Sequence, residues 1–132
     1  MSTPEENENL FTQFLDDYFA ECDEHLTVIR ESILLLESYV NQPQVEKSLL
    51  DKLFGSFHSL KGLSGMVGVK EAEQIAHEME SYLRSLRQVQ VILTQPGIDA
   101  LVAGIKILEQ VINNYRIQAP IPDIQPTIEQ LQ

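Results

Sequence analysis

An imidazole and several glycines share one face of a predicted helix between residues 57 and 68. A helix advances about 100° per residue, so Lys61, Gly62 and Gly65 lie on the same face as His58. Glycine in a helix interior costs about 1 kcal/mol relative to alanine, so two glycines on one stripe indicate that another group approaches closely. That group could be a reaction partner of the imidazole, or only a neighbouring helix beside an incidental surface histidine.

Two charged residues favour the chemical alternative. Glu80 is predicted on the flank of the next helix, where its carboxylate reaches His58 if the two helices are neighbours. A carboxylate that accepts a hydrogen bond from one imidazole nitrogen fixes the tautomer and leaves the other nitrogen as a nucleophile. Lys61, one turn beyond His58, suits the oxygens of a phosphoryl group. The pattern therefore predicts nucleophilic chemistry at His58, with a phosphoryl group as a suitable electrophile.

Four amphipathic helices are predicted to position these residues, because apolar residues recur at steps of three and four. They cover about residues 8–39, 44–68 and 69–87, and a fourth helix begins at Pro96 after a connection. The apolar stripe of the first helix is predicted to comprise Phe11, Leu15, Tyr18, Cys22, Leu26, Ile29, Ile33 and Leu36. Short connections and the lack of an alternating strand pattern predict an all-α fold, an antiparallel up-and-down four-helix bundle.

The two ends of the chain are predicted to lie outside this bundle, which is expected to span residues 9–116. Residues 1–8 are acidic and polar and are expected to form a disordered tail. Residues 117–132 contain three prolines, and two predictions stay open for them. They form either a short fifth, C-terminal helix docked through Ile124, Ile128 and Leu131, or a linker.

The charge balance excludes several classes of partner. Nine basic and 20 acidic residues give a net charge of −11, which opposes binding to nucleic acid or to anionic lipid. No apolar run approaches the roughly 20 residues that span a bilayer, and the acidic start is unlike a signal peptide. We expect a soluble, cytoplasmic protein with protein partners and no membrane insertion. The single cysteine, Cys22, is expected to be a buried, unpaired thiol.

The residues around His58 resemble the signature of the histidine-containing phosphotransfer (Hpt) domain. The form is that of the N-terminal domain of CheA-type chemotaxis kinases, and it is carried by His58, Ser59, Leu60, Lys61, Gly62, Ser64, Gly65 and Gly68. Segment 14–26 resembles the first helix of that family, and segment 77–80 resembles a pair of residues on its third helix. The resemblance covers roughly residues 10–116.

The resemblance implies a role for each matching residue. His58 would be the phosphorylated histidine, and Glu80 would be the hydrogen-bond partner that orients it. Lys61 would provide electrostatic support to the phosphoryl group, and His77 matches a further supporting position.

The same resemblance implies a surface for partner proteins. Gly62 matches the glycine that admits partner domains, and Leu63 and Gly65 lie beside it. Leu63 stands where a second small residue is common in the family, and Val67 stands where an aromatic residue is common. We therefore expect the docking surface at Gly62, Leu63 and Gly65 to be particular to the partners of this chain.

The resemblance implies a phosphocarrier module of a two-component system rather than an enzyme in its own right. His58 would accept a phosphoryl group from an ATP-bound histidine kinase domain and pass it to an aspartate of a response-regulator receiver domain. The sequence has no Gly-rich phosphate loop, Walker motif or kinase signature, so no cofactor is expected in this domain. ATP and Mg²⁺ would be supplied by the partner domains, and the chain could be the N-terminal part of a CheA-like kinase.

Two functions other than phosphotransfer are alternatives for this sequence. One is a helical interaction scaffold in which His58 is chemically silent, which the combination of His58, Lys61, Gly62 and Glu80 disfavours. The other is a metal-binding bundle built on the three histidines and nearby carboxylates. Di-iron bundles use Glu-x-x-His pairs, whereas this chain places three residues between Glu21 and His25. No metal site is therefore predicted.

Overall fold

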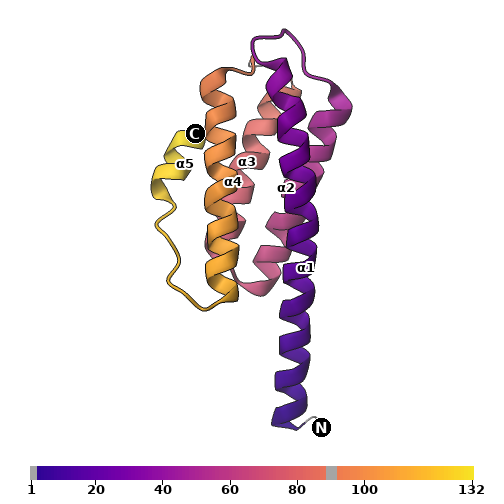
Figure 1. The fold of residues 1–132 in the computed structure, drawn as a ribbon, viewed down its shortest axis with the longest axis vertical. Helices are drawn as coiled ribbons and strands as arrows, with labels where there is room; N and C mark the ends of the chain where they lie inside the picture. The colour runs from indigo at the N-terminus through magenta and orange to yellow at the C-terminus, as the bar shows by residue number, and fades with distance from the viewer. Residues whose placement is uncertain (1–2, 89–91) are drawn as a thin grey trace.

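The described part of the protein, residues 3–88 and 92–132 of a computed structural model, contains helices and no strands. Their order is α1 (Pro4–Leu36), a 3₁₀ turn η1 (Glu37–Tyr39), α2 (Lys47–Val67), α3 (Lys70–Arg87), α4 (Gln95–Arg116) and α5 (Gln125–Leu131). The four long helices run alternately up and down side by side, and α5 lies outside them (Figure 1). The predicted all-α, antiparallel four-helix bundle with a short fifth helix is confirmed.

Helix α1 begins earlier than the sequence pattern predicts. A disordered tail was expected over residues 1–8, of which residues 1 and 2 lie outside the described part, but α1 starts at Pro4. The hydroxyl of Thr3 accepts a hydrogen bond from the backbone N–H of Glu6 at 3.2 Å, and the Glu6 carboxylate accepts one from the N–H of Thr3 at 3.1 Å. This reciprocal cap, followed by proline at the first helical position, fixes the start of the helix.

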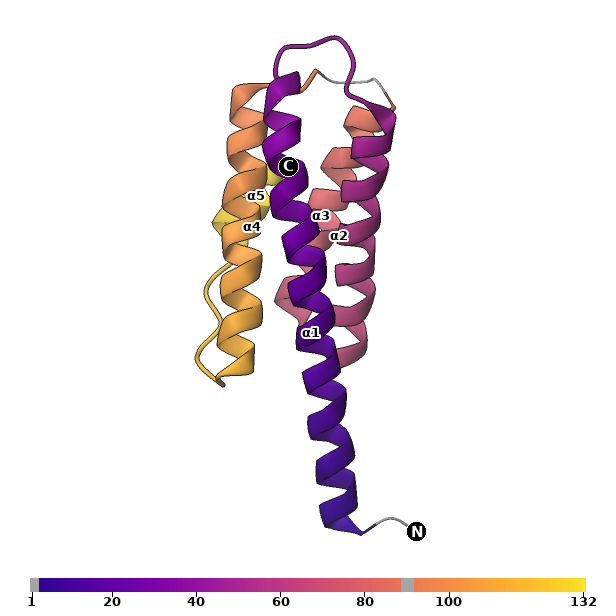
Figure 2. The ribbon, with the colours of Figure 1, turned by 45° about the vertical axis from the view of Figure 1, so that its right-hand side comes forward.

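The first part of α1 extends beyond the other helices (Figures 1 and 2). Phe11 was predicted in the core, but its exposed fraction is 58 %. The prediction fails because α1, with 33 residues, is longer than the 21-residue α2 beside it, and none of the other described helices extends to that end (Figure 1). The buried stripe begins instead at Tyr18 and continues to Leu36.

The centre of the bundle is apolar and closely follows the predicted stripes. The apolar residues that recur at steps of three and four along α3 are all buried: Ala72, Ile75, Ala76, Met79, Leu83 and Leu86. Tyr18 on α1 and Ser64 on α2 form a buried hydrogen bond of 2.9 Å between their hydroxyl oxygens. Cys22 is fully buried, and this burial raises the pKa of its thiol to about 11, so the thiol is protonated at neutral pH.

A tight turn joins α2 to α3. Gly68 ends α2 with a φ of 89°, in the left-handed region that favours glycine. The backbone N–H groups of Gly68 and Val69 both donate to the carbonyl of Ser64 at 2.9 Å. Val69 is buried, and α3 starts at the next residue. The turn makes α2 and α3 antiparallel neighbours, which sets the register between His58 and Glu80.

Residues 117–132 contain both a connecting segment and a docked fifth helix, the two alternatives that the sequence left open. Residues 117–124 form a non-helical connection, and α5 then docks against α3 and α4 through Thr127, Ile128 and Leu131. Gly104 on α4 allows this approach, because an added Cβ would lie 3.1 Å from the Met79 sulfur and 3.5 Å from a Leu131 methyl carbon. Helix α5 therefore extends the core over a face of α4 that a plain four-helix bundle leaves open.

Candidate functional site

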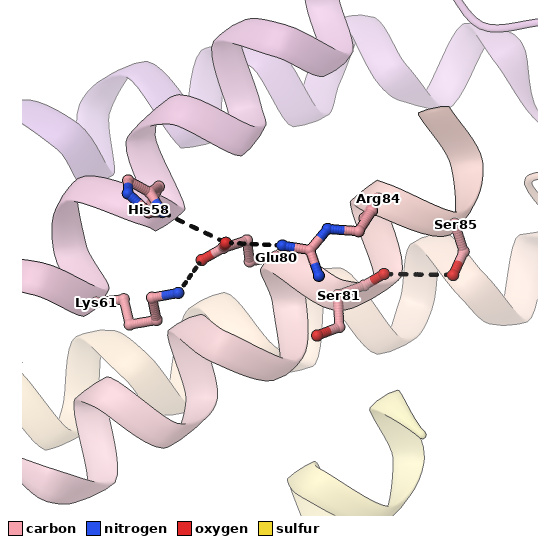
Figure 3. Close-up of polar contacts among 6 residues, drawn as sticks. All are labelled: His58, Lys61, Glu80, Ser81, Arg84 and Ser85. Carbon is pink, nitrogen blue, oxygen red and sulfur yellow. Dashed lines mark hydrogen bonds and ion pairs between the residues drawn. The ribbon is translucent and has the colours of Figure 1, made fainter. Parts of the chain in front are cut away.

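The imidazole of His58 lies across the α2–α3 interface from Glu80. Its Nδ1 is 3.3 Å from Oε1 of the Glu80 carboxylate (Figure 3). The side chain of His58 is 64 % exposed, whereas that of Glu80 is only 3 % exposed. The structure thus places a solvent-accessible ring on a nearly buried carboxylate.

Glu80 is buried because its neighbours on α3 are buried. Ala76, Met79 and Leu83 turn the adjoining stripe of α3 into the core, and the turn at Gly68 holds α2 close on the Glu80 flank. A buried carboxylate costs several kcal/mol when it lacks partners. The stability of this arrangement therefore depends on the groups that surround Glu80.

Three cationic or potentially cationic side chains surround that carboxylate. The Lys61 ammonium lies 2.9 Å from Oε2, and Nη2 of Arg84 lies 3.3 Å from Oε1, the oxygen that also faces His58 (Figure 3). The Lys61 contact is an ion pair by distance, since no hydrogen bond of good geometry reaches Oε2 within the described residues. Burial alone would raise the pKa of Glu80, but the contacts with Lys61 and His58 outweigh it and lower this pKa below its ordinary value. Glu80 is consequently an anion at neutral pH.

An anionic Glu80 determines which imidazole nitrogen can react. When the proton resides on Nδ1, the ring donates it to Oε1, and Nε2 carries the free lone pair. Because His58 is exposed, that nitrogen is available to an incoming electrophile. The geometry can therefore support nucleophilic attack from Nε2 without a change in the helices.

An aromatic ring from the same helix packs against the flank of His58. Phe54, one turn before His58 on α2, stacks on the imidazole with ring centres 6.3 Å apart and an interplanar angle of 9°. The guanidinium groups of Arg84 and Arg87 lie 5.6 and 5.5 Å from the centre of the Phe54 ring. Phe54 and His58 are four residues apart, and so are Glu80 and Arg84. This spacing places each pair on one helix face, so it could have identified the Phe54–His58 and Glu80–Arg84 contacts from the sequence.

The two glycines beside His58 have different surroundings. An added Cβ on Gly62 meets nothing within 4 Å, so this face of α2 is open. An added Cβ on Gly65 would lie 3.2 to 3.5 Å from the Glu73 carboxyl group on α3. Gly65 therefore accommodates a side chain of the neighbouring helix, which is the packing alternative, whereas Gly62 leaves room for another molecule.

His77 is not brought to His58. It is exposed on α3, one turn before Glu80, and within residues 3–88 and 92–132 it forms no hydrogen bond or ion pair. Its supporting role stays a prediction that rests on the resemblance alone.

A shallow hollow adjoins His58 on its other side. Ser59, Gly62 and Leu63 of α2 line it together with three residues of α1, namely Glu21, Glu24 and His25. Sequence reasoning did not place α1 residues at the site, because the rotation of one helix about another cannot be read from either helix alone. The surface next to the imidazole is therefore acidic.

The described residues show neither a cluster of metal ligands nor a membrane-spanning helix. Among the described residues, no three histidine, cysteine or carboxylate side chains gather closely enough to hold a metal ion, so the metal-bundle alternative has no ligand set there. No helix in this part of the chain has the length and apolar character needed to cross a membrane.

Comparison with known proteins gives the family. The sequence matches the Hpt domain over residues 13–114. The chain belongs to the Hpt domain family. Hpt domains are phosphocarrier modules rather than enzymes in their own right. The resemblance predicted from the residues around His58 is thereby confirmed, and it supports a place in two-component signalling.

The similar curated proteins are chemotaxis proteins named CheA. The chain is 29 % identical over 120 residues to the chemotaxis protein CheA of Halobacterium salinarum, covering 90 % of this chain and 17 % of that protein. It is 26 % identical over 122 residues to CheA of Listeria monocytogenes, covering 92 % and 19 %. For CheA of Bacillus subtilis the identity is 28 % over 102 residues, covering 77 % and 15 %. The chain thus spans less than a fifth of the length of these relatives.

Proposed function

We propose that this chain is the phosphotransfer module of a two-component system, with His58 as the phosphorylated residue. In this function His58 accepts a phosphoryl group from ATP held by a histidine kinase domain and passes it to an aspartate of a response-regulator receiver domain. The observation that carries the proposal is the 3.3 Å contact between the exposed His58 ring and the buried Glu80 carboxylate. The family match and the CheA relatives support it.

The first transfer uses the free lone pair of Nε2. That lone pair attacks the γ-phosphorus of ATP, the bond from this phosphorus to the bridging oxygen breaks, and ADP leaves with the electron pair. The Nδ1 proton stays on the ring, and the resulting cationic phosphoimidazole is stabilised by the anionic Glu80. In the second transfer an aspartate oxygen of the receiver attacks the same phosphorus, and the electron pair of the broken P–N bond returns to Nε2.

The partner domains supply what this chain lacks for the reaction. We propose that ATP and Mg²⁺ are bound by the kinase and receiver domains, which add the positive charge that stabilises the transferring group. The roles proposed here are orientation of His58 by Glu80 and, for Lys61, retention of the Glu80 anion together with the electrostatic support of the phosphoryl group that the resemblance implies. His77 is kept as a supporting residue on the resemblance alone.

Partner docking is proposed at the open face of α2. Gly62 and Leu63 line the hollow beside His58, and the acidic residues Glu21 and Glu24 of α1 border it. A partner with basic side chains around its reacting group would complement this surface. Because the donor is ATP bound to a kinase of the CheA type, we place the exchange in the cytoplasm.

Labelling with radioactive ATP tests the proposal. The chain is incubated with the catalytic core of a CheA-type kinase and [γ-³²P]ATP, and we expect an acid-labile, base-stable label that His58→Gln abolishes. His25→Gln and His77→Gln are matched controls, since each removes one of the other two histidines, and both should remain labelled. Circular dichroism checks that each variant is folded. Undiminished labelling of folded His58→Gln would refute the assignment.

A further inference from the structure

Oxygen Oε1 of Glu80 serves two donors at equal distance. Nδ1 of His58 and Nη2 of Arg84 both lie 3.3 Å from it, while Oε2 faces Lys61. Arg84 lies one turn beyond Glu80 on α3, and its side chain is 52 % exposed. Arg84 therefore contacts the same atom that holds the nucleophile, although it does not itself contact the imidazole nitrogens.

The position of Arg84 is fixed by a second contact. Its guanidinium lies 5.6 Å from the centre of the Phe54 ring, and the same ring stacks with the imidazole of His58. A cation near an aromatic face is attracted by the negative potential of the ring. Phe54 thus contacts both Arg84 and His58 beside Glu80.

A fixed cation at Oε1 acts on the protonation of His58 in one direction. Part of the negative charge of Oε1 is neutralised by Arg84, so the carboxylate stabilises a protonated imidazole less well. The guanidinium also repels an imidazolium directly. Both effects favour the neutral ring, which is the form with a free lone pair.

We propose that Arg84 is a positioning residue that acts through Glu80 to keep the imidazole of His58 neutral and able to accept a phosphoryl group. The proposal rests on the proposed function of His58. It assigns a role to a residue outside the His58, Lys61, Gly62 and Glu80 set.

The other charges around His58 explain why such a cation is needed. On the α1 side, Glu21, Glu24 and His25 line the hollow that His58 also lines. The two carboxylates add negative potential on that side, as Glu80 does on α3. Lys61 on α2 opposes them, and Arg84 adds a second opposing charge.

Arg87 provides a matched control. Its guanidinium lies 5.5 Å from the centre of the same Phe54 ring, but its ion pair is with Asp51, at 3.0 Å. Arg87→Gln therefore removes one positive charge and one contact with Phe54 but no contact with Glu80. Arg84→Gln removes a positive charge, a contact with Phe54 and the contact with Glu80.

Nuclear magnetic resonance of the His58 ring tests the proposal without a kinase. The imidazole shifts are followed over pH in the wild-type chain, Arg84→Gln, Arg87→Gln and Arg84→Lys. We expect the midpoint of the His58 titration to move to higher pH by about 0.5 unit in Arg84→Gln, the size expected for one partly exposed charge contact. Arg87→Gln should stay within about 0.2 unit of the wild type, and Arg84→Lys should recover at least half of the shift. An unchanged or lowered midpoint in Arg84→Gln, or an equal shift in Arg87→Gln, would overturn the proposal.

Phosphorylation by phosphoramidate adds a kinetic readout. In this reaction Nε2 attacks the phosphorus and ammonia leaves, so no partner domain is required. The ratio of the Arg84→Gln rate to the wild-type rate cancels the pH dependence of the donor. We expect a ratio of about one third below the titration midpoint and about one at pH 9, since half a unit in the midpoint is a threefold change in neutral ring. A ratio that is constant over pH would indicate a structural role and contradict the inference. If labelling persists in His58→Gln, the proposed function fails, whereas the ring titration still judges the role of Arg84.

Discussion

Met79 and Glu80 are consecutive residues of α3, both nearly inaccessible to solvent, and they lie about 100° apart on two different sides of that helix. Met79 packs towards Gly104 of α4 and the docked helix α5, in a wholly apolar contact. Glu80 faces α2, where its carboxylate is surrounded by His58, Lys61 and Arg84. Burial of Met79 therefore serves the stability of the bundle, whereas burial of Glu80 serves the orientation of a reactive group.

The largest effect should come from breaking the apolar side. Met79→Ala removes a fully buried side chain between α3, α4 and α5, and we expect a loss of about 2–5 kcal/mol in the free energy of unfolding. The phosphorylation rate of the fraction that remains folded should be unchanged. Urea denaturation measures the first quantity, and labelling at a temperature well below the transition measures the second. A large fall in rate without loss of stability would contradict the division between the two sides.

The converse variant is Glu80→Ala. Without the carboxylate, nothing holds the Nδ1–H tautomer of His58 and the ring is free to rotate, so phosphorylation should slow by about tenfold or more, because misplacing a reacting group can cost on the order of 100-fold. The far-ultraviolet circular dichroism spectrum should remain that of the wild type. Glu80 would be merely a structural carboxylate if the variant were phosphorylated at the wild-type rate.

Acid should distinguish the two sides as well. The pKa of Glu80 is lower in the folded protein than its ordinary value of 4.5, because the contacts with Lys61 and His58 outweigh burial. A lowered carboxyl pKa stabilises the fold above the ordinary value, and this stabilisation is lost as pH falls through the folded value. The stability advantage of the wild type over Glu80→Gln should therefore shrink as pH falls below 4.5. The deficit of Met79→Ala should not depend on pH in this way, and urea denaturation at a series of pH values compares them.

The smallest change in stability is expected at Gly62, on the open surface beside His58. Because an added Cβ there meets nothing within 4 Å, Gly62→Ala should stabilise α2 by up to about 1 kcal/mol. Gly62→Leu should leave the fold intact but impair transfer to a receiver domain more strongly than phosphoramidate labelling, since only the former needs close approach of a partner. If the leucine variant lost the same fraction of its wild-type rate in both reactions, Gly62 would not belong to the docking surface.

Local periodicity was sufficient for the fold and for the central pair of the site. The spacing of apolar residues gave the inner face of α3, and the same spacing put Glu80 on the flank that faces His58. Both inferences depend only on positions along single helices and on the antiparallel packing of two neighbours. Lys61 was also predicted near the site, although the structure brings its ammonium to Glu80 at 2.9 Å rather than leaving it free.

The features that the sequence did not predict depend on the rotation of one helix relative to another, or on where a helix ends. The approach of Glu21, Glu24 and His25 to the hollow requires the rotation of α1 about α2, which neither stripe encodes. The docking of α5 was one of two open predictions for residues 117–132, but the sequence did not indicate that Gly104 of α4 receives it. Phe11 was assigned to the core because its spacing continues the stripe of α1 past the end of the neighbouring helix.

The left-handed turn at Gly68 also bears on how the site forms during folding. Because that turn closes a short loop, α2 and α3 can pair as a helical hairpin at low entropic cost. Both members of the His58–Glu80 pair belong to this hairpin. We therefore expect the geometry that orients the nucleophile to form early and to depend on local chain closure.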